Sequence, residues 1–483
     1  MLLGLDLGTS SVKALLVGED GGAVGEGSAP YEVLAPRAGW AESSPGEWWE
    51  AVVEATGLAV GERGAEVTAL GLSGQMHGVV LVGEGGSPLR PAVLWADARS
   101  GAELEAYGEL DEELRRRLAN PPAVGMAGPS LLWLRDNEPE AYAAAVWALQ
   151  PKDWLRMRLT GEVAAEPSDA SATLLYDLSA DDWSYAVVDH LGLREGLLAP
   201  LVSSADVAGK LTAQAAEELG LPRGLPVAAG AADTAAAMLG VGLSRTGPAQ
   251  LTVGTGGQIV TPRESPEVDP SLRTHLYRGA LPGLWYSMAA IQNAGLALEW
   301  VRKVLGVSWE EVYDEAFAVS PGSGGVTFLP YLSGERTPRF DPGARGAWAG
   351  LGLDHTRGHL LRAALEGVAF ALREAVEALQ DLGPIIPEMR LAGGGAGGEP
   401  WRQLLADVLG RPLWLLPDEI SSVASARGAA FLAGLASGVY PTAEDTLPLT
   451  PEPEILIRPG EPSYELVYER YKELYPKLYG ESG

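Results

Sequence analysis

The chain contains no cysteine. Disulfide bonds, thiolate catalysis and metal sites with cysteine ligands are therefore excluded. Long hydrophobic runs are missing as well, because no stretch of about 18 uncharged apolar residues occurs, the length that a membrane-spanning helix needs. The first residues form a strand-like segment that already carries Asp6 and Lys13, unlike a secretory leader. The sequence therefore predicts a cytoplasmic protein with no membrane partner.

Basic side chains are scarce. The chain has 35 Lys and Arg against 64 Asp and Glu, which leaves a formal net charge of −29 at pH 7. Nucleic-acid binding is disfavoured, because phosphate backbones recruit clustered cations. ATP remains a suitable ligand, since backbone N–H groups and a divalent cation such as Mg²⁺ can offset its charge.

Strands alternate with amphipathic helices along the whole chain, which predicts an α/β fold. With 483 residues, 46% of them hydrophobic, the chain is too long for one core and favours two domains. Strands are predicted at Leu2–Leu7, Ser11–Val17 and Ala23–Ser28, as an antiparallel meander. The segment Thr356–Leu379 has the periodicity of a buried helix.

A second strand–turn–strand segment spans Pro248–Pro262 and repeats the glycine-threonine turn found at Gly8 and Thr9. Two similar openings in one chain predict two related domains. The boundary is expected in the turn-like segment Leu243–Gly247. The predicted domains are therefore residues 1–244 and 245–483.

The segment Gly4–Ser10 has the chemistry of a phosphate-binding hairpin. Gly8 would let backbone N–H groups approach phosphate oxygens, Thr9 and Ser10 would add hydroxyls, and Asp6 could hold Mg²⁺ through water. Ordinary turns favour the same residue types, so this segment alone leaves both interpretations open.

A second turn of the same composition, Val253–Gly257, contains Thr255 and Gly256 and could contact the other side of a triphosphate. Paired hairpins around an ATP cleft resemble the actin, hexokinase and heat-shock-protein ATPase superfamily. That resemblance implies two ribonuclease H-like α/β domains with the active site in the cleft between them.

A third glycine cluster, Gly393–Gly398, follows a strand-like segment and precedes a helix that contains Trp401–Leu409. The cluster satisfies the dinucleotide-binding spacing G-x-G-x-x-G, and Asp418 lies about 20 residues further on. A dehydrogenase that binds NAD is therefore an alternative function. We favour adenosine binding, because a lone G-x-G-x-x-G is a weak signal and two phosphate-type turns precede it.

Asp233 stands among small residues after the apolar segment Leu225–Ala229. A carboxylate at the end of a strand can accept the proton of a substrate hydroxyl as a general base. An Asp ahead of an Ala-rich helix is also a common N-cap, and the residues alone favour the cap.

Several segments, in order and over nearly the whole chain, resemble the FGGY family of carbohydrate kinases, which includes glycerol, gluconate, ribulose and xylulose kinases. They are GLDLGTSSVK (4–13), LSGQMHG (72–78), LWADAR (94–99), PKDWLRMRLTGE (151–162), SDASATLLYD (168–177), AAGAADTAAA (228–237), LTVGTGGQ (251–258), ERTPRFDPGARGAWAGL (335–351), GAWAGLGLDHTRGHLLRAALE (346–366) and the Gly393 cluster.

The resemblance implies an ATP-dependent kinase of a ketopentose. The expected reaction converts D-xylulose to D-xylulose 5-phosphate, with another ketose or polyol, such as ribulose, as the alternative. The partners would be a small ketose and MgATP, without nucleic acid, and a homodimer is left open. A non-catalytic actin-like ATPase would lack Asp233 and the SGQMHG segment, and both are present.

The resemblance also assigns roles by position. Asp233 corresponds to the general base, and Asp6 to the carboxylate beside Mg²⁺ and the phosphates. The sugar contacts would be Met76, His77 and Thr234, and the phosphate and nucleotide contacts Thr9, Ser10, Thr255, Gly256, Gly295, Gly394 and Gly395. Residues 1–244 would thus bind the sugar, and residues 245–483 the nucleotide. The family usually has Asn at position 234, so Thr234 leaves the preferred ketose open.

Overall fold

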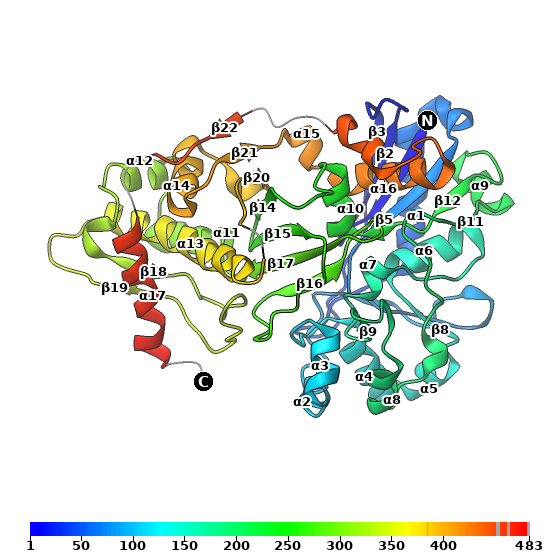
Figure 1. The fold of residues 1–483 in the computed structure, drawn as a ribbon, viewed down its shortest axis with the longest axis horizontal. Helices are drawn as coiled ribbons and strands as arrows, with labels where there is room; N and C mark the ends of the chain where they lie inside the picture. The colour runs from blue at the N-terminus through cyan, green and yellow to red at the C-terminus, as the bar shows by residue number, and fades with distance from the viewer. Residues whose placement is uncertain (384, 451–454, 461–463, 481–483) are drawn as a thin grey trace.

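Two α/β halves lie side by side along the long axis of the molecule (Figure 1). The structure is a computed structural model and describes residues 1–383, 385–450, 455–460 and 464–480. Each half is built on its own mixed β-sheet, and the two sheets come from successive parts of the chain. The predicted two-domain α/β fold is confirmed. Among the described residues, no helix combines the length and apolar character needed to cross a bilayer.

The first sheet is built around the amino-terminal strand. In the described residues its order is β11 (Val207–Lys210), β12 (Pro226–Ala228), β5 (Ala69–Gly74), β1 (Leu2–Leu7), β2 (Ser11–Val17) and β3 (Ala23–Pro30), and β13 (Ala231–Ala232) also pairs with β5. The pairs β1–β2 and β2–β3 are antiparallel, so the predicted meander is confirmed. Strand β1 also pairs with β5, in parallel. Asp6 therefore has a neighbour on each side, Lys13 on β2 and Ser73 on β5.

The second sheet repeats the plan of the first. In the described residues its order is β16 (His275–Arg278), β17 (Trp285–Ile291), β15 (Gly257–Arg263), β14 (Ala249–Val253), β20 (Met389–Ala392), β21 (Leu413–Leu415) and β22 (Ile455–Ile457). The hairpin β14–β15 corresponds to β1–β2, and β20 is parallel to β14 as β5 is to β1. The two openings predicted from the glycine-threonine turns therefore begin equivalent sheets.

Helices fill the connections between these strands. They are α1 (Pro45–Val60), α2 (Leu104–Gly108), α3 (Glu112–Leu118), α4 (Ala127–Asn137), α5 (Pro139–Ala144), α6 (Pro151–Thr160), α7 (Pro167–Ala170), α8 (Tyr185–His190), α9 (Ala213–Leu219), α10 (Asp233–Gly240), α11 (Gly295–Leu305), α12 (Trp309–Phe317), α13 (Arg357–Gln380), α14 (Glu399–Leu409), α15 (Asp418–Ser421), α16 (Ala424–Ser437) and α17 (Glu465–Tyr479). The helix predicted at Thr356–Leu379 is α13, and it packs against β15 and β17 in the second core.

Short strand pairs complete the chain between the larger elements. They are β4 (Glu42–Ser43) with β7 (Ala92–Val93), β6 (Val80–Val82) with β8 (Trp147–Leu149), β9 (Tyr176–Asp177) with β10 (Asp182–Trp183), and β18 (Thr327–Leu329) with β19 (Ala347–Ala349). Figure 1 shows β8 and β9 in the first half, and β18 and β19 in the second half.

Helix α16 crosses from the second half of the chain to the first sheet, where it packs against β1, β5 and α10 (Figure 1). Glycines make the close approach possible. A Cβ atom at Gly4 would lie 1.9 Å from the carbonyl oxygen of Ala426, and one at Gly71 would lie 1.8 Å from that of Ala429. The sequence analysis did not predict this crossing, and the division at residue 244 remains a prediction.

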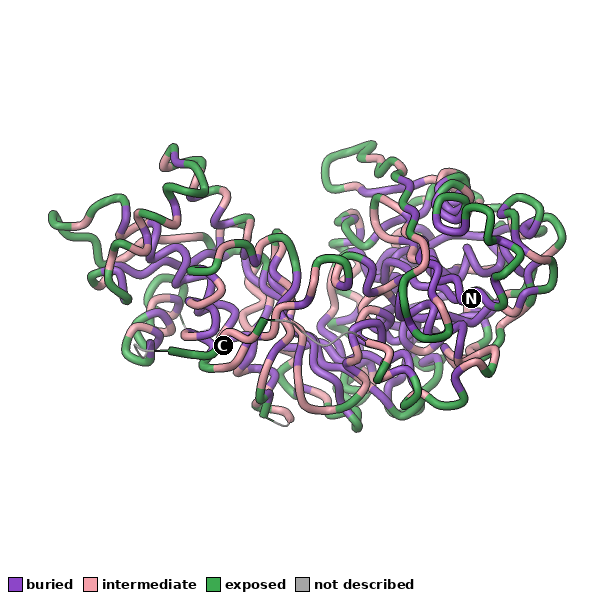
Figure 2. Tube along the Cα trace, turned by 90° about the horizontal axis from the view of Figure 1, so that it is seen from above, coloured by how far each residue is buried: buried purple, intermediate pink, exposed green. Residues whose placement is uncertain are grey.

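Buried segments run through the centre of both halves, with exposed segments at the outside (Figure 2). Each half has a large apolar core. A third cluster joins them, since it contains Leu2 from the first sheet, Tyr286 from the second sheet and Ala426 from α16. The two halves therefore share packed side chains at their junction.

Candidate active site

A cleft of about 330 Å³ is lined by residues of both halves. Six of the predicted site residues line it, namely Met76, His77, Asp233, Thr234, Thr255 and Gly256. The other predicted residues, Asp6, Thr9, Ser10, Gly295, Gly394 and Gly395, are not among its lining residues. The volume suits a small metabolite.

Asp233 is the first residue of α10, directly after the short strand β13. Its Oδ1 accepts hydrogen bonds from the backbone N–H of Thr234 at 2.5 Å and from the Thr234 hydroxyl at 3.1 Å. The N-cap of the helix is Ala232, so the interpretation of Asp233 as an N-cap is wrong. Burial, helped by the negative charge of Asp6, raises the pKa of Asp233 to about 7. A carboxylate with this pKa is suited to accept a proton near neutral pH.

A buried ionic cluster supports the segment that carries Asp233. Lys152 Nζ lies 2.6 Å from Asp153 Oδ1, 3.5 Å from Glu166 Oε1 and 3.4 Å from Asp169 Oδ2, and all four side chains are at most 1% exposed. Because isolated charges are costly to bury, such a cluster requires mutual pairing. The cluster is tied to the site by Ser168, whose hydroxyl accepts a hydrogen bond from the backbone N–H of Ala232, next to Asp233, at 2.9 Å.

His77 lies in the left-handed region of backbone space, with φ of 71°. Such a conformation is uncommon for a residue other than glycine, and residues of this kind tend to cluster at functional sites. Its Nδ1 is 2.7 Å from the carbonyl oxygen of Ala172. Burial lowers the pKa of His77 to about 4, so the ring is neutral at pH 7. Since a carbonyl can only accept, Nδ1 carries the proton, and Nε2 is left as an acceptor for a ligand hydroxyl.

Asp6 lies near the carboxyl end of β1, and its Oδ1 is buried without a hydrogen-bond partner among the described residues. Burial raises the pKa of Asp6 to about 6, although the neighbouring Ser73 hydroxyl and the charge of Lys13 act against the increase. A carboxylate oxygen without a partner is a suitable ligand for a hard divalent cation. Among the described residues, no three His, Asp or Glu side chains form a metal site by themselves. A cation at Asp6 would therefore complete its shell with phosphate oxygens and water.

The first hairpin is connected to the cleft through Trp95. The indole Nε1 of Trp95 donates a hydrogen bond of 2.9 Å to Thr9 Oγ1, and Trp95 lines the cleft. Thr9 can still donate its own hydroxyl proton to a phosphate oxygen. Ser10 lies in the same turn, where its carbonyl oxygen accepts from the Tyr31 N–H at 3.1 Å. Sequence reasoning missed Trp95 itself, although it lies in the quoted LWADAR segment.

The second hairpin is packed closely against two glycine segments. The N–H of Gly295, at the start of α11, donates to the carbonyl oxygen of Gly254 at 2.9 Å. A Cβ atom at Gly295 would lie 2.4 Å from that oxygen, and one at Gly395 would lie 2.9 Å from the carbonyl oxygen of Val253. A Cβ atom at Gly394 would meet open space, which leaves its backbone accessible to a ligand. The predicted nucleotide glycines therefore gather around the Thr255 turn.

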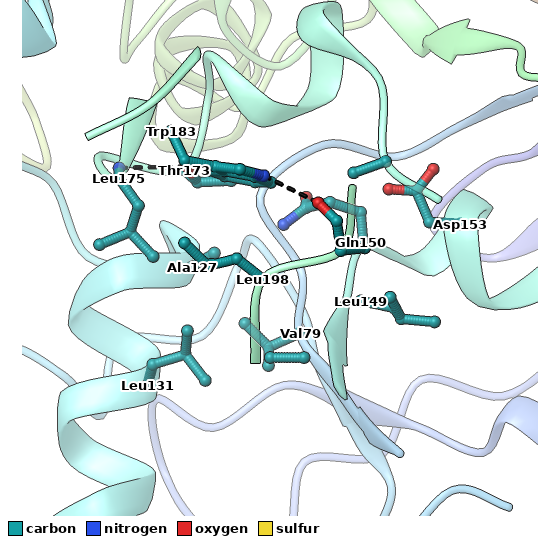
Figure 3. Close-up of a pocket in the computed structure, with 13 residues that line it drawn as sticks. Val79, Ala127, Leu131, Leu149, Gln150, Asp153, Thr173, Leu175, Trp183 and Leu198 are labelled. Atoms are coloured by element: carbon teal, nitrogen blue, oxygen red, sulfur yellow. Dashed lines mark hydrogen bonds between the residues drawn. The ribbon is translucent and has the colours of Figure 1, made fainter. Parts of the chain in front are cut away.

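A smaller cavity of about 20 Å³ lies within the first half and is separate from the cleft. Figure 3 shows the apolar side chains of Leu131, Leu149 and Leu198 around it, with Gln150 and Asp153 at one side. This volume holds about one water molecule, so neither a sugar nor a nucleotide fits. The cleft between the halves is therefore the candidate site.

Two equivalent sheets with paired glycine-threonine hairpins, and a partly buried carboxylate of raised pKa in the cleft between them, form the arrangement expected of a phosphotransferase with the actin-like ATPase fold. Residues 1–240 match the N-terminal domain of the FGGY family of carbohydrate kinases, and residues 249–437 match its C-terminal domain. The chain belongs to this family. It is therefore an ATP-dependent carbohydrate kinase, and the dehydrogenase and the non-catalytic ATPase are no longer alternatives.

Several known proteins are similar to this chain over its full length. The xylulose kinase of Escherichia coli K12 is 34% identical, with 99% of both chains covered. The crystal structure of a xylulose kinase from Rhodospirillum rubrum is 32% identical and superposes with a TM-score of 0.91, covering 99% of this chain and 98% of that one. A gluconate kinase from Lactobacillus acidophilus is 25% identical, with a TM-score of 0.93 and coverage of 99% and 98%.

Proposed function

We propose that this kinase transfers the γ-phosphoryl group of MgATP to the terminal hydroxyl of a ketopentose, with D-xylulose as the substrate and D-xylulose 5-phosphate as the product. The observation that carries the proposal is the position of Asp233 in one cleft with His77 and the Thr255 hairpin. The similarity to xylulose kinases over the full length supports the choice of sugar. Ribulose is the second candidate, because the residue beside the base is Thr234, where the family usually has an asparagine that contacts the sugar.

In the proposed mechanism, Asp233 accepts the proton of the terminal hydroxyl as that oxygen attacks the γ-phosphorus in line. Backbone N–H groups of the two hairpins, with the hydroxyls of Thr9 and Thr255, stabilise charge on the transferring oxygens. Asp6 would hold Mg²⁺, which supplies positive charge to the phosphate oxygens when it is bound. Neutral His77 orients the sugar through Nε2. Closure of the cleft would exclude water and so limit ATP hydrolysis.

A coupled assay of ADP formation tests the proposal directly. D-Xylulose, L-xylulose, D-ribulose, L-ribulose, D-fructose, glycerol and gluconate are compared at equal concentration. We expect the highest kcat/KM with D-xylulose. A higher value with gluconate or glycerol would overturn the ketopentose assignment while leaving the kinase activity in place.

The His77→Asn variant is expected to raise the KM for the sugar about tenfold, because it removes an acceptor placed for a sugar hydroxyl. Asparagine tolerates the positive φ of this position better than alanine does, so the backbone conformation is retained. The KM for MgATP should stay unchanged. Thr255→Val is the matched comparison. It should weaken the binding of MgATP and leave the KM for the sugar unchanged. An unaltered sugar KM in His77→Asn would remove His77 from the sugar site.

The rate should also depend on pH through Asp233. The base must be ionised to accept a proton, and its pKa is raised to about 7, so the active form is lost as the pH falls through that value. We expect kcat/KM to decrease about tenfold per pH unit below pH 7. The measurement is a pH profile from 5.5 to 8.5 at saturating Mg²⁺, and a flat profile contradicts the assignment.

A further inference from the structure

The segment around Arg336 lies against the end of strand β17, at the edge of the cleft. The N–H of Gln292 donates to Glu335 Oε1 at 2.7 Å, and the N–H of Thr337 donates to the carbonyl oxygen of Ala290 at 3.0 Å. Both neighbours of Arg336 are thus fixed to the second sheet. Arg336 itself lines the cleft and is partly buried.

The guanidinium of Arg336 makes no hydrogen bond or ion pair with any other described side chain or backbone group. The adjacent charged residues do not pair with it, and Glu335 Oε2 is buried without a hydrogen-bond partner among the described residues. Glu335 Oε1 accepts from the backbone N–H groups of Gln292 and Arg336 at 2.7 Å each, and Arg339 pairs with Glu374. Buried or partly buried arginines elsewhere in this chain are usually paired, as Arg99 is with Asp97 and Arg362 with Glu366. A cation in a cleft without a partner is therefore available to a ligand.

The charge of Arg336 acts on groups that line the cleft together with His77. The positive charge of Arg336 contributes to the pKa shifts of His77, His275 and Tyr277, which all line the cleft. His275 stacks on Tyr277 with ring centroids 5.7 Å apart, and His77 lies 6.2 Å from the same ring. The charge that acts on Asp6, in the phosphate hairpin, is that of Lys13 instead.

The hydrogen-bonding capacities of Arg336 and His77 define what a ligand must offer. Arg336 can only donate, and it has five N–H groups in a planar fork. His77 presents Nε2, which accepts. A hydroxyketone satisfies both, because its carbonyl oxygen only accepts and its hydroxyls donate. A polyol of the same length has a hydroxyl in place of the carbonyl oxygen, and the proton of that hydroxyl needs an acceptor, which a guanidinium cannot provide.

We propose that Arg336 donates hydrogen bonds to the carbonyl oxygen at C2 of the ketose and thereby selects ketoses against polyols of equal length. The inference rests on the proposed function, since it deepens the assignment of a ketopentose substrate. Arg336 is then a specificity-determining residue that binds the end of the sugar not phosphorylated by the enzyme.

The test compares D-xylulose with xylitol and D-arabinitol, the two polyols formed by reduction of its carbonyl group. KM and kcat are measured for the ketose, and inhibition constants for the polyols, in the wild-type enzyme, Arg336→Gln and Arg336→Lys. We expect Arg336→Gln to raise the KM for D-xylulose about 10- to 100-fold, as for the loss of hydrogen bonds to a charged group. The polyol constants should change less than about threefold. Arg336→Lys should recover part of the loss, because it retains a charged donor without the fork.

Exposed Arg223 provides the control, since Arg223→Gln removes the same charge at a residue that does not line the cleft. Unfolding temperatures of all variants identify any loss that comes from the fold, and a destabilised Arg336→Gln is replaced by Arg336→Lys as the deciding variant. The inference about Arg336 is overturned if Arg336→Gln weakens the binding of the ketose and of the polyols by the same factor. It is also overturned if the variant raises the KM for MgATP and not that for the sugar. Either result leaves the proposed function in place. Absence of ketopentose phosphorylation in the wild-type enzyme overturns the proposed function first.

Discussion

Replacing Asp233 with asparagine is expected to lower kcat for sugar phosphorylation about a hundredfold or more, because the amide cannot accept the proton of the attacking hydroxyl. The fold around the site should survive. Asparagine retains an oxygen at the position of Oδ1, which accepts from the N–H and the hydroxyl of Thr234. Steady-state kinetics and the binding of MgATP measured by calorimetry separate the two effects.

Asp189 serves as the control for this experiment. It is an exposed carboxylate on α8, and Asp189→Asn should leave kcat, both KM values and the unfolding temperature unchanged. Asp233→Asn should lose the pH dependence near pH 7 together with the rate. Near-normal turnover in Asp233→Asn would show that another group accepts the proton.

Introducing a methyl group between α10 and α16 should strongly lower the stability of the protein. A Cβ atom at Gly428 would lie 1.8 Å from the carbonyl oxygen of Ala236, so Gly428→Ala forces the two helices apart. Overpacking of this kind costs about 1 to 3 kcal/mol or more. We expect an unfolding temperature lower by about 2 °C or more, measured by calorimetry. Turnover should fall as well, because α10 begins at Asp233.

Gly57→Ala is the matched control for Gly428→Ala. Gly57 lies in α1, and a Cβ atom there would meet nothing within 4 Å. Alanine favours helix over glycine by about 1 kcal/mol, so this variant should be as stable as the wild-type protein or more stable. A Gly428→Ala protein that unfolds at the wild-type temperature would mean that α10 and α16 separate without cost.

Local patterns were sufficient to predict much of the fold. The hairpins at Gly8 and Thr255 and the long helix α13 depend on neighbouring residues, such as turn glycines and apolar positions at helical spacing, and the structure contains them. The repeat of the hairpin motif was enough to predict the duplicated sheet. Crossing of α16 was not predictable in this way, because Gly4 and Ala426 meet only through the tertiary fold.

The candidate site was predicted in part, for a similar reason. Asp233 and His77 belong to segments whose composition or family resemblance drew attention to them. The sequence did not show that His275 and Tyr277 face the same cleft, because the alternation of a strand does not say which face meets the other domain. Nor could it show that Arg336 has no acidic partner among the residues that the structure describes. Both facts arise from the way the second sheet is placed against the first half.

The position of α16 has a consequence for the order in which the molecule can assemble during translation. All strands of the first sheet have been synthesised by Ala232, but α16, which packs on β1 and β5, begins at Ala424. Until then the glycine-lined side of the sheet at Gly4 and Gly71 lacks its partner helix. Domains usually fold as they emerge from the ribosome. The first half of this protein cannot complete its packing until most of the second half has been synthesised. The nascent chain therefore has a long interval in which a chaperone can bind the uncovered face, and a fragment that ends at the predicted domain boundary would keep that face exposed permanently.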